Sequence, residues 1–191
     1  AHISRSELGL KEDSLLIVHA GNIGLMHRLN ELIDAVGRLD HLEVELAITG
    51  GGVALDSAEN HVKSNGYKNI KFLGYLDDVN FSGLLTLADI AAATLIPGME
   101  TVSMPSRALT YMSAGLPVLA LMKKASDIGD LVVAEKCGWV AETVSEATQI
   151  INELVDDAEQ VAESKKQALA TYLAKYTRAS GVERYSGLIN N

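Results

Sequence analysis

The chain has 191 residues, of which 48% are hydrophobic and 21% are charged, and its formal net charge is −9. This length and composition are those of a globular protein with a sizeable core, in one large domain or two very small ones, and they exclude a disordered chain. The acidic balance argues against a nucleic-acid groove, which needs a basic face, so no nucleic-acid partner is expected.

Apolar runs that alternate with helical periodicity define the predicted elements. The expected strands span 15–20, 44–49, 70–73, 90–96, 118–121 and 139–140. The expected helices span 25–39, 55–65, 81–88, 103–115, 126–136, 144–156, 157–175 and, weakened by two glycines, 177–191. Because strands that alternate with helices form parallel sheets with right-handed crossovers, we predict one Rossmann-like α/β domain of about six parallel strands flanked by helices.

The first predicted strand ends in a short glycine-containing turn, Gly21-Asn22-Ile23-Gly24. Glycine lets backbone approach a ligand closely, so the turn resembles a phosphate cradle between a strand and a helix. It is not a G-x-G-x-x-G motif, and no Walker lysine follows. On this motif alone, an ordinary tight turn is the favoured interpretation.

The turns after the second and third strands also carry glycines. Three consecutive glycines follow residue 49, and Gly74-Tyr75-Leu76 then turns the chain out of the sheet, before Asp77 and Asp78 cap the next helix. Because ligands bind at the carboxyl edge of open parallel sheets, we expect Gly21 to Gly24, Tyr75 and the start of the central helix to converge there.

The central helix begins with features that suit an anion. Ser103 is a good N-cap, and Pro105 fits the first helical turn. The backbone N–H groups of Ser106 and Arg107 should then be free, the helix dipole favours negative charge, and the guanidinium matches phosphate oxygens. A capped helix with a solvated arginine explains this stretch equally well.

Other chemical groups are sparse. The histidines are His2, His19, His27, His41 and His61. None has metal-ligand spacing, so no metal site is expected. Cys137 is the only cysteine, which excludes an internal disulfide and fits a reducing compartment; we expect a buried thiol in a cytoplasmic protein.

Four motifs in order carry a resemblance to a known family. They are G-N-x-G after the first strand, T-G-G-G after the second, F-L-G-Y after the third, and Y-M-x-A-G-L-P-V-L at the end of the central helix. Together they resemble the C-terminal, donor-binding domain of retaining GT-B glycosyltransferases of group 1 (glycosyltransferase family 4-like). The P-S-R before Y-M-x-A-G is similar to the capsule, O-antigen and exopolysaccharide enzymes.

The resemblance covers about 5–191 and implies a domain organisation. Residues 1–191 would form the C-terminal nucleotide-sugar-binding half of a GT-B fold, with 177–191 as its closing helix. The N-terminal acceptor domain would be absent from this chain. The short polar start of the chain agrees with this expectation.

The family's functional positions can be placed on this chain. The nucleotide base would lie against Gly74, Tyr75 and Leu76. The basic pair that meets the diphosphate falls on Asn22, which is not basic, and on Arg28.

The central helix carries further family positions. Two family glutamates, for donor sugar and ribose, fall on Val102 and Thr110, and Glu100 is near enough to take the first role. Arg107 stands where capsule-type relatives carry lysine or arginine. The resemblance thus implies three catalytic residues, Arg28, Glu100 and Arg107. It implies these donor-binding residues: Gly21, Asn22, Gly24, Gly74, Tyr75, Leu76, Ser103, Ser106 and Thr110.

The implied reaction is transfer of a sugar from a UDP- or GDP-type nucleotide sugar to a saccharide or lipid-linked acceptor in bacterial surface polysaccharide synthesis. It would need no metal, because the arginines and the helix start would stabilise the leaving diphosphate. Such a protein would be cytoplasmic or peripheral at the inner face of the plasma membrane, with membrane contact only through its missing part. This chain alone would be inactive. The alternatives are a GT-B epimerase or hydrolase fragment and a non-catalytic nucleotide-binding module.

Overall fold

A computed structural model describes residues 3–99 and 106–182 of the chain. Its six parallel strands form one sheet in the order β3-β2-β1-β4-β5-β6. The strands are β1 (Leu15–Ala20), β2 (Val44–Thr49), β3 (Ile70–Gly74), β4 (Ile90–Thr94), β5 (Val118–Leu121) and β6 (Gly138–Ala141). The predicted single α/β domain with about six parallel strands is confirmed.

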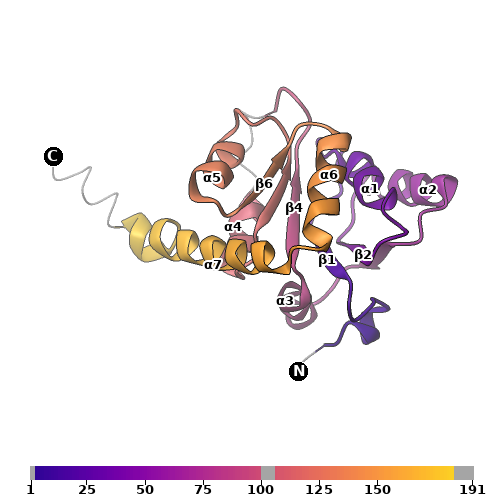
Figure 1. Cartoon of the computed structure of the whole chain (residues 1–191), viewed down its shortest axis with the longest axis horizontal. Coiled ribbons are helices and arrows are strands. Elements are labelled where there is room, and N and C mark those ends of the chain that lie inside the picture. The colour runs from indigo at the N-terminus through magenta and orange to yellow at the C-terminus, as the bar shows by residue number, and fades with distance from the viewer. Residues whose placement is uncertain (1–2, 100–105, 183–191) are drawn as a thin grey trace.

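Helices cover both faces of this sheet (Figure 1). They are the 3-10 helix η1 (Ser6–Leu8), α1 (Leu29–Gly37), α2 (Leu55–Asn65), α3 (Asp78–Leu87), α4 (Ser106–Ser113), α5 (Asp127–Glu135), α6 (Val144–Val155) and α7 (Ala158–Lys175). One core cluster joins the sheet to α1, α2 and α6, and the other joins it to α3, α4 and α5. Both faces of β1, β2, β4 and β5 are buried, which explains why these strands are near-continuous apolar runs in the sequence.

Several predicted boundaries differ from the structure, and hydrogen bonds explain three of these differences. Helix α1 begins at Leu29, not at 25, because the backbone of Ile23 is bonded to Gly51 and Ala54 in the turn after β2. Strand β4 ends at Thr94, not at 96, because the N–H of Ile96 donates to Met26 in the turn after β1.

Helix α3 is the third case, since it begins at Asp78 and not at 81. The Asp77 carboxylate accepts a 2.8 Å hydrogen bond from the Asn80 N–H, so Asp77 is the N-cap and Asp78 already lies inside the helix. At the other end of the chain, residues 178–182 are helical, as predicted for the start of 177–191. The remainder of that predicted helix lies outside the described residues.

Strand order reverses between β1 and β4, which makes this the topological switch point of the sheet. Open α/β sheets bind their ligands in the crevice outside the carboxyl ends of the strands at such a point. In the described part of the chain, no helix combines the length and the apolar character needed to cross a membrane.

Candidate functional site

Strands β1 and β4 separate at their carboxyl ends, and this separation opens a crevice. β1 pairs with β2 along its whole length, up to Ala20 with Thr49, whereas its pairing with β4 ends at Val18 with Ala91. Beyond that point, the backbone groups with which β1 and β4 face each other lack strand partners and need others. Two side chains supply them, Tyr111 to β1 and His19 to β4.

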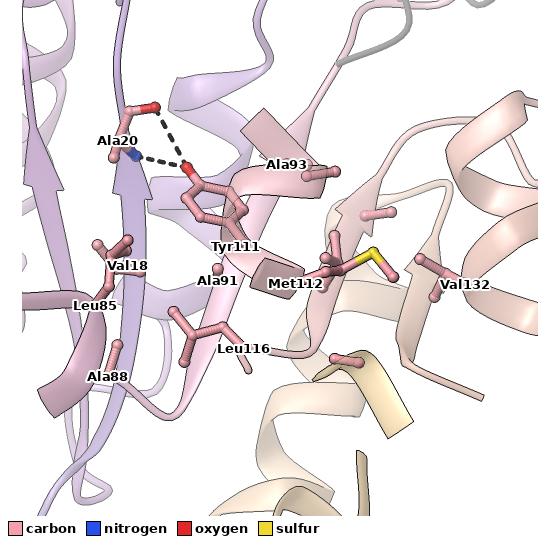
Figure 2. Packing of buried hydrophobic residues seen from close by; sticks show 14 of the residues in the cluster. Val18, Ala20, Leu85, Ala88, Ala91, Ala93, Tyr111, Met112, Leu116 and Val132 are labelled. Atoms are coloured by element: carbon pink, nitrogen blue, oxygen red, sulfur yellow. Dashed lines mark hydrogen bonds between the residues drawn. The ribbon is translucent and has the colours of Figure 1, made fainter. Parts of the chain in front are cut away.

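Tyr111 comes from α4 and is almost fully buried under the end of β1. Its hydroxyl accepts a 2.9 Å hydrogen bond from the Ala20 N–H and donates a 3.3 Å bond to the Ala20 carbonyl (Figure 2). Burial raises the pKa of Tyr111, so the hydroxyl keeps the proton that it donates. One side chain therefore completes the backbone bonding of the last residue of β1.

A pocket of about 290 Å³ lies over this crevice. It is lined by the turns after β1, β2 and β3 together with the first turns of α3 and α4. Five of the predicted site residues line it: Gly21, Tyr75, Leu76, Arg107 and Thr110. Larger hollows exist, such as one of about 670 Å³ beside α5, β6, α6 and α7, but they lie away from the carboxyl edge at the switch point.

Backbone hydrogen bonds tie the turns that form the pocket floor. The Gly21 N–H donates to the Thr49 carbonyl at 2.9 Å, and the Gly50 N–H donates to the Gly74 carbonyl at 2.8 Å. Gly50 has φ +113°, and a Cβ on it would lie 2.1 Å from the Gly21 carbonyl oxygen. Only glycine permits this close approach, so the pocket floor requires glycine at position 50.

Tyr75 forms an exposed wall of the pocket. The residue is 83% exposed, and a Cβ on Gly51 would come within 2.8 Å of its ring, so the ring lies directly against the Gly51 backbone. Its hydrophobic surface is available to a planar ligand. The predicted neighbour Gly74 contributes backbone, since its carbonyl also accepts a 2.7 Å bond from the Thr49 hydroxyl.

Arg107 lines the pocket, and its guanidinium lies over Gly21. Its Nη1 is 3.3 Å from Nε2 of His19, and its Nη2 donates a 3.2 Å bond to the Asn22 carbonyl. A Cβ on Gly21 would lie 3.1 Å from Nη2, so glycine leaves room for the guanidinium. Among the described residues, no carboxylate forms an ion pair with Arg107.

His19 is fully buried in β1 next to these groups. Burial lowers its pKa to about 3, the charge of Arg107 acts in the same direction, and the bond to the Ala92 carbonyl opposes both. His19 and Tyr111 were not among the predicted site residues. A signal existed for His19, which is the only polar side chain in the run LLIVHA and lies two residues before Gly21.

Arg28 is not brought to this pocket. It is buried, and its guanidinium donates to the Glu31 carboxylate through two contacts and to the Glu142 carbonyl at 2.9 Å. Together with Gly24 it lines a separate hollow of about 270 Å³. The predicted diphosphate contact by Arg28 stays a prediction, and this geometry favours Arg107 for that role because the charge of Arg28 is already paired.

The other predicted positions lie either at the edge of the pocket or outside the described residues. Ser106 is exposed at the described start of α4, and Asn22 offers its carbonyl to Arg107. Glu100 and Ser103 lie outside the described residues, so their roles stay predictions. Residues 3–99 and 106–182 contain no cluster of three or more potential metal ligands.

Elsewhere, the predicted inert thiol agrees with the structure. Cys137 is fully buried, and burial raises the pKa of its thiol to about 11. A thiol with this pKa is a poor nucleophile at neutral pH, which fits a packing role.

An open parallel sheet with a glycine-floored pocket and an arginine at its switch point defines an α/β domain suited to an anionic ligand. Residues 2–172 match the family of glycosyl transferases group 1, and the chain belongs to this family. The expected resemblance is thereby confirmed.

Curated relatives come from bacteria. The chain is 27% identical over 119 residues to the probable glycosyltransferase WbjE of Pseudomonas aeruginosa, covering 62% of this chain and 30% of that protein. It is 24% identical over 127 residues to the putative colanic acid biosynthesis glycosyl transferase WcaI of Escherichia coli K12, covering 66% and 31%. The chain thus matches about a third of the length of these relatives.

Solved structures share the fold. HepE of Anabaena, in complex with UDP and glucose, superposes with a TM-score of 0.80 at 19% identity, over 98% of this chain and 50% of that one. WaaG, a glycosyltransferase involved in lipopolysaccharide biosynthesis, gives 0.71 at 19% identity, over 90% and 46%. These similarities confirm one Rossmann-like half of a GT-B fold.

Proposed function

We propose that this chain is the donor-binding half of a retaining glycosyltransferase and that the pocket at the switch point binds a nucleoside diphosphate sugar of the UDP or GDP type. The observation that carries the proposal is Arg107, which lies over a glycine floor at the pocket with no carboxylate partner among the described residues. Family membership and the UDP complex of HepE support the same ligand class.

The ligand would lie across the pocket in a defined order. The base would pack against Tyr75 and Leu76, where a planar aromatic surface is exposed. The diphosphate would lie above Gly21, within reach of Arg107 and the N–H of Ser106, and Thr110 would face the ribose. Glu100 would contact the donor sugar.

This arrangement suits the chemistry of sugar transfer. When the bond between sugar and diphosphate breaks, negative charge grows on the leaving diphosphate. A guanidinium held in place before the reaction stabilises that charge without reorganisation, and the helix dipole of α4 contributes in the same direction. We propose that these groups supply the positive charge without a metal ion.

The transfer itself would need the rest of a longer protein. The acceptor, a saccharide or lipid-linked saccharide of bacterial surface polysaccharide synthesis, would bind an N-terminal domain that this chain does not include. The relatives WbjE and WcaI, of which the chain matches about a third, support this arrangement. The 191-residue chain would bind donor but not transfer sugar.

Calorimetry with UDP, GDP and their nucleosides tests the proposal. Arg107→Ala removes one hydrogen bond to a charged group and should weaken the diphosphate about 10- to 150-fold, while the nucleoside is unaffected. Arg38→Ala, the same change at an exposed arginine at the end of α1, is the matched control. Absence of binding at millimolar UDP and GDP, or a strict need for Mg²⁺ in an EDTA comparison, would contradict the proposal.

A further inference from the structure

Both ring nitrogens of His19 have partners, and the partners specify one protonation state. Nδ1 lies 3.1 Å from the Ala92 carbonyl, which only accepts, and Nε2 lies 3.3 Å from Nη1 of Arg107, which only donates. Nδ1 therefore carries the proton, and Nε2 presents its lone pair to the guanidinium. A protonated ring would place two donors against each other.

The separation of β1 from β4 explains why the histidine can reach both groups. Alternation along β1 places His19 on the face of Ile17, whereas Arg107 belongs to α4 on the opposite face. The two side chains meet where the strands have parted beyond Val18 and Ala91. The ring thus joins β4 on one side to Arg107 on the other.

A neutral acceptor has a different electrostatic effect from a carboxylate. Arg28 is held by Glu31, and that carboxylate compensates its charge. His19 holds Arg107 through a lone pair and compensates none of its charge. In the described residues, His19 and the Asn22 carbonyl take two of the five N–H groups of Arg107, which leaves three for a ligand.

We propose that His19 is a positioning residue for Arg107: its neutral ring fixes the guanidinium over Gly21 while leaving the positive charge whole for the diphosphate of a nucleotide sugar. This inference rests on the proposed function of the pocket. Its physical benefit is preorganisation, because a side chain ordered before binding loses less conformational entropy when the ligand arrives. A buried histidine that served packing alone would have no effect specific to the diphosphate.

Two amide substitutions separate the two ring contacts. In His19→Gln the amide reaches the region of Nε2, so an acceptor for Arg107 is retained. In His19→Asn the shorter amide reaches only the region of Nδ1, so the bond to Ala92 is retained and the acceptor is lost. His61→Asn is the matched control, because His61 lies on α2 and bonds Asp34, away from Arg107.

Calorimetry with UDP and uridine on the full 191-residue chain measures the effect. We expect His19→Asn to weaken UDP about 3- to 10-fold with uridine unchanged, as loss of one orienting hydrogen bond requires. His19→Gln and His61→Asn should stay within about twofold of the unsubstituted protein. Unchanged UDP affinity in His19→Asn would overturn the proposal.

A double-mutant cycle excludes a merely structural role. If His19 acts through Arg107, His19→Asn has no further effect on UDP in an Arg107→Ala background. The same loss in both backgrounds would overturn the proposal. The failures are distinguishable: no UDP binding by the unsubstituted chain refutes the proposed function, whereas weakening by Arg107→Ala but not by His19→Asn refutes only the role of His19.

Nitrogen-15 NMR of the unsubstituted chain provides a readout that does not depend on any variant folding. At neutral pH, Nδ1 of His19 should be protonated and Nε2 unprotonated. The opposite tautomer, or a protonated Nε2, would be incompatible with acceptance of a bond from Arg107 and would overturn the proposal.

Discussion

Replacing Tyr111 by Phe removes one oxygen atom from the structure and leaves the buried ring in place. That oxygen is bonded to both backbone groups of Ala20, at 2.9 Å and 3.3 Å (Figure 2). Ala20 has no partner on β4, because the pairing of β1 with β4 ends at Val18 and Ala91. The substitution therefore leaves the buried N–H of Ala20, at the end of β1, without a hydrogen-bond partner.

The size of the effect follows from that unsatisfied group. A buried donor without a partner costs about 1–3 kcal/mol, and the longer bond to the carbonyl adds little because that oxygen keeps a second lone pair. In a chain of this length, 1 kcal/mol shifts the melting temperature by about 2–4 °C. We expect the free energy of unfolding to fall by about 1–3 kcal/mol, with an unchanged urea m-value.

Urea denaturation of Tyr111→Phe and Tyr172→Phe measures this effect against a matched control. Tyr172 on α7 is half-buried, and its hydroxyl has no hydrogen-bond partner among the described residues, so its loss should change stability by less than about 0.5 kcal/mol. Equal stabilities for the two variants would refute the claim that Tyr111 replaces the missing strand pairing.

Two further predictions concern the pocket floor and the buried histidine. Gly50→Ala should cost more than about 2 kcal/mol of unfolding free energy, because the new Cβ would lie 2.1 Å from the Gly21 oxygen. Gly9→Ala, at a φ of +68° and with nothing within 4 Å, should cost about 1 kcal/mol, and equal costs in urea titrations would contradict the steric argument. The pKa of His19 is lowered from 6.5 to about 3 by burial, so the unfolded chain binds the proton first on acidification. The contribution of neutral His19 to the free energy of unfolding is complete above about pH 6.5 and is lost toward pH 3 at about 1.4 kcal/mol per pH unit. His19→Gln should abolish this part of the pH dependence of the unfolding free energy, measured by urea titrations between pH 7 and pH 4.

Local sequence patterns were sufficient for most of the fold. The strands are apolar runs, and glycine follows or ends β1, β2 and β3. Stop signals such as Gly66, with φ +70° at the end of α2, act within a few residues. Two of the boundaries that were wrong, the start of α1 and the end of β4, depend on distant partners. Helix α1 starts late because Ile23 bonds Gly51, and no propensity within residues 22–28 contains that information.

The site was partly predictable for the same reason. Parallel strands bring their carboxyl ends together whatever their details, so Gly21, Tyr75 and Arg107 could be placed at one edge from topology alone. The residue pair at which the pairing of β1 with β4 ends could not be predicted, because it depends on the packing of the whole sheet. His19 and Tyr111 bond the backbone exposed by that separation, and their roles became visible only in the structure.

The two arginines show how a structure separates equal candidates. In the sequence, Arg28 follows the glycine turn after the first strand and Arg107 lies at the start of the central helix, so both are cations expected at the same sheet edge. In the fold, Arg28 is buried against a carboxylate three residues away, so an approaching anion would meet a compensated charge. Arg107 is held by a neutral imidazole and a backbone carbonyl, and within residues 3–99 and 106–182 no carboxylate compensates its charge. In a chain with a net charge of −9, long-range attraction cannot draw a diphosphate to the surface, so recognition must come from such a local, uncompensated cation.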